Sequence, residues 1–218
     1  PTPHWYCKSV FPPAFYEEML ARMPAQNLFR PITELGWVKD ESGQEAKRGL
    51  LTFNGPEIQA LPGEVGDFWR AFAAGFKTER FAMTMLRKFL PQLAERYGDA
   101  LGKMNFTTMS MLISDVGGYG LGPHTDRVGR LLAALFYLPA DASRPDLGTS
   151  LYLPKDPGFV CPGGPHYGFD GFVNVATMPF VPNTAFCFLK TERSFHGVEP
   201  IATDARPRHL ISYILEAN

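Results

Sequence analysis

The sequence predicts a mainly β protein with supporting α-helices, in which the strands form an antiparallel sandwich or a jelly roll. Two observations lead to this fold class. Between residues 65 and 89, apolar side chains recur with the spacing of helix faces. After Met104, short apolar segments lack that period and alternate with Gly- and Pro-containing turns, with no helical pattern between them. We therefore expect one domain over residues 1–218, with residues 1–103 mostly helical support and N-terminal loops and residues 104–218 a jelly-roll core.

Length and composition set the broad class of the protein. A chain of 218 residues and 24.3 kDa fits one domain, and 45% hydrophobic with 20% charged residues is the ordinary globular range. A net charge of -1 argues against a general nucleic-acid or anionic-membrane surface, which needs clustered positive charge. No apolar run approaches the roughly 18 residues of a membrane span. We expect neither a nucleic-acid nor a membrane partner.

The cysteine pattern indicates a reducing compartment. Three Cys, an odd number without a Cys-x-x-Cys pair, provide neither a disulfide framework nor a zinc ribbon. The first residues of the sequence also lack the basic and then apolar pattern of a secretory signal. We expect free thiols and a cytoplasmic location.

Four helices are expected in the first half. The first opens at Pro12-Pro13, carries apolar residues every four positions at Phe15, Met19 and Met23, and is ended by Pro24. Two apolar stripes, over residues 65–76 and 81–89, predict longer helices packed on the outside of a sheet. A last short helix has Pro91 in its first turn and stops at Gly98. Between the first and second helices, residues 37–45 are typical of a charged hairpin tip or loop, and residues 54–56 of a turn.

The second half is expected to consist of strands separated by turns. Gly and Pro punctuate a series of apolar segments that are too short for helices and are not periodic at 3.6 residues. The expected strands are residues 104–115, 131–138, 149–153, 172–177, 184–189 and 208–215.

Two imidazoles and one carboxylate form the candidate metal site. His124 and Asp126 are two residues apart, so on a strand both side chains point to the same face. His196 would come from a distant strand. Two His and one carboxylate on one side of a metal leave open positions, which is the arrangement of non-haem Fe(II) oxygenases. The alternative is that these histidines are structural and hydrogen-bonded.

A cation at the start of the last strand is the candidate site for an organic acid. Iron oxygenases commonly draw electrons from a 2-oxo acid, and its distal carboxylate calls for the planar fork of an arginine. Arg206 and Arg208 both qualify, and they have the same strand parity. Since Pro207 is tolerated only at a strand's first position, Arg208 lies inside the strand, and burial favours it. The alternative is a surface arginine paired with Asp204 or Glu199.

Residues near the metal motif are candidates for substrate binding. Arg127 and Arg130 follow the metal loop and, if they lie at its mouth, favour an anionic substrate group; the alternative is a solvated pair. Residues 155–171 are rich in Gly, Pro and aromatic side chains, including Tyr167, and could form a lid over the metal. The alternative is an irregular surface loop. We do not assign His166 as a ligand.

An ordered set of segments resembles a known family, the Fe(II)- and 2-oxoglutarate-dependent dioxygenases, in particular the prolyl-4-hydroxylase-like branch. The resemblance covers roughly residues 104–216, and the segments recur in the family's order with strand-sized gaps. In this sequence they are His124-x-Asp126, Phe136-Tyr137-Leu138-Pro139, residues 146–153, residues 182–188, His196-Gly197-Val198-Glu199-Pro200 and Arg208.

The resemblance implies a double-stranded β-helix, the cupin-like jelly roll, with helices supporting its outer face. It further implies that His124, Asp126 and His196 bind Fe(II), which reacts with O2. Arg208 would hold the distal carboxylate of 2-oxoglutarate, with Tyr137 donating its hydroxyl to the same carboxylate; the alternative for Tyr137 is a core tyrosine. One departure affects this pocket: where the family has a hydroxyl residue two positions after the arginine, this sequence has Leu210, and Ser212 stands four after.

The leading hypothesis is therefore a 2-oxoglutarate-dependent hydroxylase that acts on a C–H bond of a small molecule or an amino-acid or peptide side chain and releases succinate and CO2. A second hypothesis is a metal-dependent hydrolase or isomerase on a cupin-like barrel, with zinc and a bound water. A third is a non-catalytic jelly-roll binding domain. The substrate, the oligomeric state and the choice among hydroxylation, desaturation and epimerisation are left open by the sequence.

Overall fold

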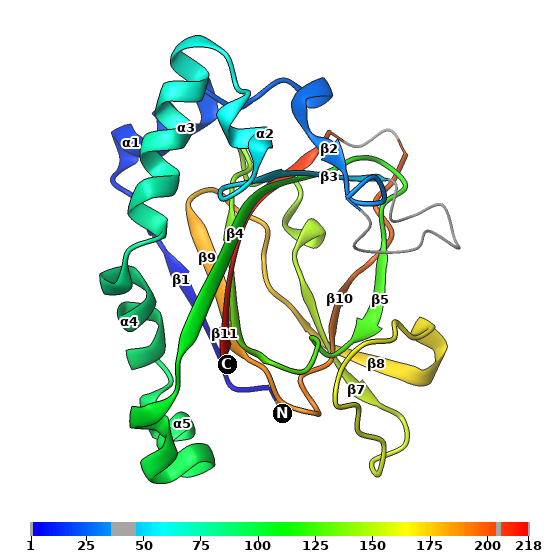
Figure 1. The fold of residues 1–218 in the computed structure, drawn as a ribbon. Helices are drawn as coiled ribbons and strands as arrows, with labels where there is room; N and C mark the ends of the chain where they lie inside the picture. Colours follow the sequence, from blue (N-terminus) through cyan, green and yellow to red (C-terminus); the bar gives the residue numbers. More distant parts are fainter. Residues whose placement is uncertain (1, 36–46, 204–205, 218) are drawn as a thin grey trace.

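Two antiparallel sheets face each other in a jelly roll, and the helices cover the outer face of the larger one (Figure 1). The structure is a computed structural model that describes residues 2–35, 47–203 and 206–217. The predicted loop or hairpin tip at residues 37–45 lies outside the described residues, and so does Asp204. The predicted fold class is confirmed. None of the described helices is long and apolar enough to cross a membrane.

The larger sheet has seven strands and the smaller has four. In spatial order the larger sheet contains β1 (His4–Lys8), β9 (Thr184–Leu189), β6 (Arg130–Tyr137), β11 (Arg208–Ala217), β4 (Phe106–Asp115), β3 (Arg48–Thr52) and β2 (Arg30–Pro31). The smaller sheet contains β5 (Leu121–His124), β10 (His196–Val198), β7 (Ser150–Pro154) and β8 (Phe172–Thr177). The six strands predicted from the sequence are β4, β6, β7, β8, β9 and β11, and all six are confirmed.

Five α-helices are present in the described part of the first half: α1 (Pro13–Ala21), α2 (Pro56–Gln59), α3 (Gly63–Phe76), α4 (Glu79–Arg87) and α5 (Leu90–Tyr97). The four predicted helices are confirmed as α1, α3, α4 and α5, although α1 ends two residues before Met23. Thr78 caps α4 by accepting a hydrogen bond from the Phe81 N–H. Gly98 ends α5 with a φ of 50°, in the left-handed region that suits glycine.

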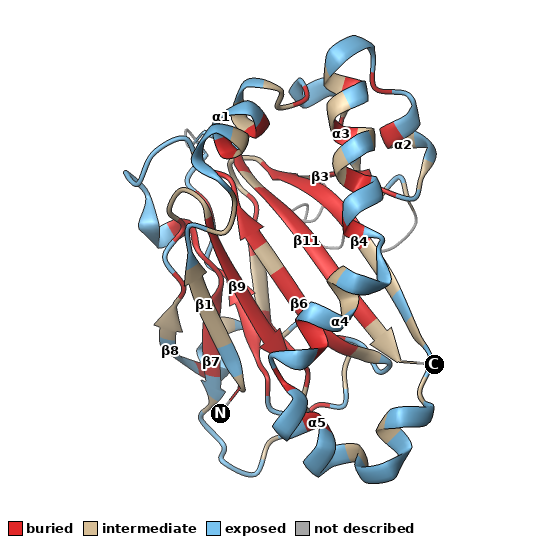
Figure 2. Ribbon diagram, turned by 90° about the vertical axis from the view of Figure 1, so that its left-hand side faces the viewer, coloured by how far each residue is buried: buried red, intermediate tan, exposed pale blue. Residues whose placement is uncertain are grey.

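Strand β11 separates two hydrophobic cores, because its side chains alternate between the faces of the sheet. Ile211, Tyr213 and Leu215 join the outer core, which lies between the sheet and the helices. Leu210 and Ile214 join the inner core of the jelly roll. Figure 2 shows the buried strands β6, β11 and β4 passing beneath α3 and α4.

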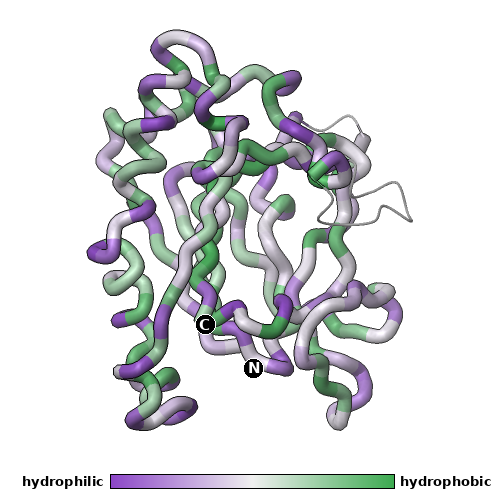
Figure 3. The backbone as a smooth tube through the Cα atoms, viewed as in Figure 1, coloured by the Kyte–Doolittle hydropathy of each residue, from purple (hydrophilic) through white to green (hydrophobic). Residues whose placement is uncertain are grey.

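The outer core is aromatic, as the helix stripes predict. Trp69 of α3 is fully buried, and Phe76 and Phe81 hold the Tyr213 ring at centroid distances of 5.9 and 4.9 Å. Along the tube of the helices, green hydrophobic and purple hydrophilic stretches follow one another at short intervals (Figure 3). Burial of such large side chains, each contributing about 1.5–3 kcal/mol, holds the helix layer on the sheet.

The first half also contributes three strands that the sequence did not predict. β1 pairs with β9, while β3 pairs with β4 in the interior of the sheet. Four consecutive residues of β3 are buried, so both faces of the strand are covered. The segment therefore lacks the alternation of buried and exposed residues that identifies a strand in a sequence. The prediction of mostly helical support and N-terminal loops for residues 1–103 did not include these strands, which extend the larger sheet.

Candidate functional site

The two histidines of the candidate metal site lie on neighbouring strands. His124 is the last residue of β5 and His196 the first of β10, and the two residues are direct partners in the register of the small sheet. Asp126 lies in the loop after β5, so His124 and Asp126 do not share a strand. The ligand atoms of all three side chains lie within 4.8 Å of one another, and all three residues are buried.

Main-chain carbonyls set which nitrogen of each imidazole faces the site. Nδ1 of His124 lies 3.0 Å from the Gly122 oxygen, and Nδ1 of His196 lies 3.0 Å from the Ser194 oxygen. A carbonyl oxygen only accepts, so each Nδ1 carries the proton and each Nε2 keeps a free lone pair. Such carbonyl partners are typical of metal-binding histidines because they fix the ring and its tautomer.

Burial keeps both imidazoles neutral. It lowers the pKa of His124 well below its usual value, and the neighbouring His196 lowers that pKa further. Burial also lowers the pKa of His196, against the opposing attraction of Asp126. Since only a neutral imidazole can donate a lone pair to a metal, this environment favours the ligand form of both residues.

The carboxylate of Asp126 has one oxygen paired and one oxygen left open. Oδ1 accepts a hydrogen bond from Arg130, whereas Oδ2 is buried and has no hydrogen-bond partner among the described residues. Burial alone would raise the pKa of Asp126, but the neighbouring Arg130, together with His196 and His124, outweighs burial and lowers it. An ionised, buried oxygen without a partner is costly unless a cation completes its coordination.

The donor set fits a divalent transition metal. One donor atom from each imidazole and one carboxylate oxygen lie within 4.8 Å of one another, and the two imidazole rings are 4.3 Å apart between centroids. Two imidazoles and one carboxylate are the ligand set of non-haem Fe(II) oxygenases, and zinc accepts the same donors. All three residues line a cavity of about 100 Å³ inside the jelly roll.

Arg208 lies in the wall of the same cavity. Its side chain is 1% exposed. Its Nε donates to the Leu147 carbonyl at 2.5 Å, one terminal nitrogen donates to Asp115 at 2.7 Å, and the other donates to Thr149 Oγ1 at 3.3 Å. The alternative of a surface arginine is therefore contradicted for Arg208.

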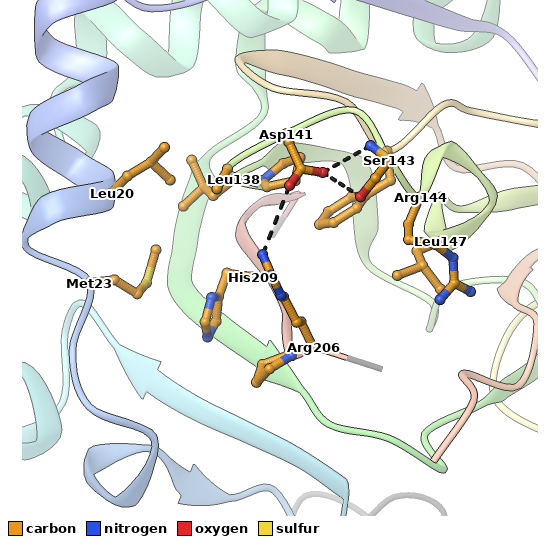
Figure 4. A pocket seen from close by; sticks show the side chains of 13 residues that line it. Leu20, Met23, Leu138, Asp141, Ser143, Arg144, Leu147, Arg206 and His209 are labelled. Carbon is orange, nitrogen blue, oxygen red and sulfur yellow. Dashed lines mark hydrogen bonds and ion pairs between the residues drawn. The ribbon is translucent and has the colours of Figure 1, made fainter. Parts of the chain in front are cut away.

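Arg206 points away from this cavity. Its side chain is 90% exposed, and its guanidinium lies 3.9 Å from a carboxylate oxygen of Asp141. Figure 4 shows Arg206 and Asp141 facing each other in a larger outer pocket of about 760 Å³, which is also lined by Leu20 and Met23. Only Arg208 of the two candidate arginines therefore shares a cavity with the metal ligands.

Tyr137 lies behind Arg208 and is fully buried. Its hydroxyl oxygen accepts the Thr149 N–H at 3.0 Å, and its ring centroid is 5.6 Å from the Arg208 guanidinium carbon. Burial raises the pKa of Tyr137, so the hydroxyl keeps a proton that it can donate. Ser212 lines the cavity and supplies a hydroxyl where Leu210 does not.

The residues predicted near substrate are engaged with the protein itself. Arg127 pairs with Glu216 at 2.6 Å, and Arg130 pairs with Asp126. Tyr167 donates its hydroxyl to Cys161 Sγ at 3.4 Å and its main-chain N–H to the Pro123 carbonyl at 3.0 Å.

Residues 155–171 lie beside the metal loop. Besides the contact of Tyr167 with Pro123, the exposed His166 brings its ring centroid to 4.7 Å from that of His124. The segment therefore borders the metal site, as a lid would, through an imidazole and main-chain contacts.

Two residues of the cavity region were not predicted from the sequence. Asp115 ends β4 and is fully buried between Arg208 and Arg48 of β3; Arg48 also lines the cavity. Neither residue belongs to a local motif, and Arg48 is separated from the metal motif by the whole helical segment. Only the register of the sheet brings Arg48 and Asp115 together.

Comparisons with known proteins agree on the fold. No family model and no curated protein matches the sequence. Among solved structures, a Trichoplax adhaerens prolyl hydroxylase, in complex with a peptide fragment of the hypoxia inducible factor oxygen degradation domain, has a TM-score of 0.50 at 16% identity, covering 98% of this chain and 83% of that chain. A Pseudomonas putida prolyl-4-hydroxylase has a TM-score of 0.51 at 13% identity, covering 98% and 91%.

A third solved structure with the same fold contains the organic acid. EvdO2 from Micromonospora carbonacea var. aurantiaca, complexed with 2-oxoglutarate, has a TM-score of 0.51 at 14% identity and covers 100% of this chain and 88% of that chain. At these identities the comparison concerns the fold. The resemblance predicted from the sequence, to prolyl-4-hydroxylase-like oxygenases, is confirmed at that level.

Proposed function

We propose that the protein is an Fe(II)- and 2-oxoglutarate-dependent oxygenase that hydroxylates a C–H bond of its substrate. One observation carries the proposal: three metal donors and a buried arginine line the same small cavity. The overall reaction consumes 2-oxoglutarate, O2 and the substrate, and yields succinate, CO2 and the hydroxylated product. Bound iron would supply the activation of O2, coupled to oxidative loss of CO2 from the 2-oxo acid.

The side chains of this chain have positioning roles in the proposed reaction. His124, His196 and Asp126 would hold the metal through two Nε2 atoms and Oδ2. Arg208 uses three of its five N–H donors within the protein, which leaves two for a carboxylate. Tyr137 would add its hydroxyl proton. The buried surroundings exclude water, and a drier site strengthens each of these charge-assisted contacts.

The size of the cavity bears on the substrate. About 100 Å³ suits a small organic acid, whereas sites for drug-sized ligands occupy roughly 300–1,000 Å³. The substrate would therefore present a single group at the metal from the side bordered by residues 155–171. Both a small molecule and a peptide side chain can do so, and the fold neighbour in complex with a peptide supports the second possibility.

Direct binding of 2-oxoglutarate is the decisive test. Under anaerobic conditions, adding the acid to the Fe(II)-loaded protein is expected to produce a visible charge-transfer band, which reports on chelation and needs no knowledge of the substrate. Succinate release, screened over metabolites and peptides in the presence of O2, would then identify the substrate.

Two arginines provide a matched pair of variants. Arg208→Gln is expected to weaken 2-oxoglutarate binding about 10- to 100-fold, because a charge-assisted hydrogen-bond pair contributes about 1.5–3 kcal/mol. Arg206→Gln, two residues away and exposed, is expected to change the affinity less than about twofold. Equal affinities for both variants would refute the pocket assignment.

The choice of metal separates the oxygenase from the remaining hypotheses. A hydrolase or isomerase on this fold would work with zinc and have no use for a 2-oxo acid. A non-catalytic binding domain would retain no metal after gentle purification. Stoichiometric Fe(II) together with the charge-transfer band would exclude both.

A further inference from the structure

Three charged side chains form one row across the large sheet. Asp115 of β4 is the direct partner of Arg208 on β11 and of Arg48 on β3. Cross-strand partners point to the same face, so the carboxylate lies between two guanidinium groups. Arg48 grips the carboxylate with its Nε at 2.6 Å from Oδ1 and a terminal nitrogen at 2.8 Å from Oδ2.

Asp115 is unfavourable for binding an acid unless it is neutralised. Its carboxylate is fully buried and touches Arg208 at 2.7 Å, where it would repel the distal carboxylate of 2-oxoglutarate. With Asp115 alone, Arg208 would form a neutral pair with little remaining attraction for an anion. With Arg48 present, the row carries one net positive charge.

We propose that Arg48 is a positioning and specificity-determining residue: by neutralising Asp115, it frees Arg208 to select 2-oxo acids that carry a second carboxylate. This inference rests on the proposed function and deepens it. It assigns the preference for a dicarboxylic acid to a residue of the first half of the chain, outside the predicted core.

The surroundings of Arg48 hold it in this role. Its side chain is 16% exposed, and the guanidinium carbon lies 4.3 Å from the centroid of the fully buried Tyr119 ring. Stacking on Tyr119 and the bidentate contact with Asp115 hold the positive charge of Arg48 against the carboxylate. Arg48 also lines the cavity itself, so its charge acts directly on a bound anion.

The test compares two acids of equal chain length. Calorimetric titration of the Mn(II)-loaded protein with 2-oxoglutarate and with 2-oxopentanoate, which lacks the distal carboxylate, measures the preference without turnover. In the wild type we expect a clear preference for 2-oxoglutarate. Arg48→Gln is expected to weaken 2-oxoglutarate binding about 10- to 100-fold and to leave 2-oxopentanoate binding within about threefold.

A double variant distinguishes charge balance from structural support. Arg48→Gln combined with Asp115→Asn restores one net positive charge, so the preference for 2-oxoglutarate should return to within about threefold of the wild type. If Arg48→Gln does not fold, Arg48→Lys takes its place: it keeps the charge and should keep the preference. Circular dichroism and the Co(II) absorption spectrum check that each variant is folded and holds metal.

The outcomes separate this inference from the proposed function. A wild type that binds neither acid would refute the proposed function and, with it, the role of Arg48. A wild type that prefers 2-oxoglutarate and an Arg48→Gln variant with the same preference would overturn only the role of Arg48. Equal loss of both acids without recovery in the double variant, or loss of the preference in a folded Arg48→Lys variant, would also overturn it.

Discussion

Two groups of side chains that line the cavity differ in charge: His124, Asp126 and His196 form the candidate metal end, and Arg208 and Arg48 with Asp115 form the arginine end. At the candidate metal end, His124, His196 and Asp126 bring their donor atoms within 4.8 Å of one another, and Asp126 Oδ2 has no hydrogen-bond partner among the described residues. At the arginine end, Asp115 is already saturated by two guanidinium groups, and the surplus is positive. The first end could accept a cation, whereas at the second end the Asp115 carboxylate is already paired and one net positive charge remains.

This difference predicts how each end responds to mutation. Removing a donor from the metal end should affect ligand binding more than folding, because the site is incomplete before the metal arrives. Removing a charge from the arginine end should affect folding, because buried partners lose their compensation.

The sharpest test of the metal end is His196→Ala. We expect the variant to lose stoichiometric binding of Fe(II) or Co(II), since one of three protein donors is removed. Metal analysis after dialysis measures this loss. The melting temperature of the wild type should also rise with added metal, by mass action, while that of the variant should not. A variant that retains one equivalent of metal would show that the three residues are not the ligand set.

The corresponding test of the arginine end is Asp115→Asn. Removing the carboxylate leaves two buried like charges side by side, so we expect a loss of about 3–5 kcal/mol in the free energy of unfolding, measured by urea denaturation. Asp146→Asn is the matched control: its carboxylate pairs with Arg144 at 2.7 Å but is 60% exposed, and it should cost less than about 1 kcal/mol. Similar losses in both variants would contradict the contrast.

A smaller effect is expected where the protein orients a metal ligand. Arg130 donates to Oδ1 of Asp126, which leaves Oδ2 without a hydrogen-bond partner among the described residues. Arg130→Gln is therefore expected to lower metal affinity about 10- to 100-fold, the usual effect of losing such an orienting partner. Arg127→Gln, which removes the outer pair with Glu216, should leave the affinity nearly unchanged. Competition with a metal chelator would measure both.

The smallest effect is the pH dependence of the metal-free protein. Folding lowers the pKa of His124 and His196, so between that lowered value and the unfolded value of about 6.5 the unfolded chain binds more protons. The free energy of unfolding should therefore decrease as the pH falls through about 6.5. Urea midpoints at pH 7.5 and 5.5 test this, and the double variant His124→Gln/His196→Gln should show a smaller decrease.

The metal end was largely predictable from the sequence, because its signals are local. The short spacing of His124 and Asp126, and the later motif around His196, are enough to predict that these three side chains lie together, as the structure shows. The end of β5 at His124, with Asp126 in the following loop, was not predictable in the same way. Two residues spaced by two positions do not by themselves show where a strand ends.

The arginine end was predictable only in part. Pro207 at the edge of the last strand distinguishes Arg208 from Arg206, and the structure shows the expected difference in burial. The partnership of Arg48 with Asp115 depends on the register of three strands far apart in sequence. A buried β3 without alternation provides no local signal for that register, which is why its contribution was missed.

The alternation of β11 side chains between the two faces of the sheet also fixes the register of this strand. A slip of one residue would place Arg208 and Ser212 among the aromatic rings of the helix layer and push Ile211 and Tyr213 into the cavity. Burying the Arg208 charge among aromatic rings would cost free energy, and this cost fixes the register of β11. Packing of the helix layer on one face of β11 thereby keeps the Arg208 guanidinium on the other face, in the cavity that His124, Asp126 and His196 also line.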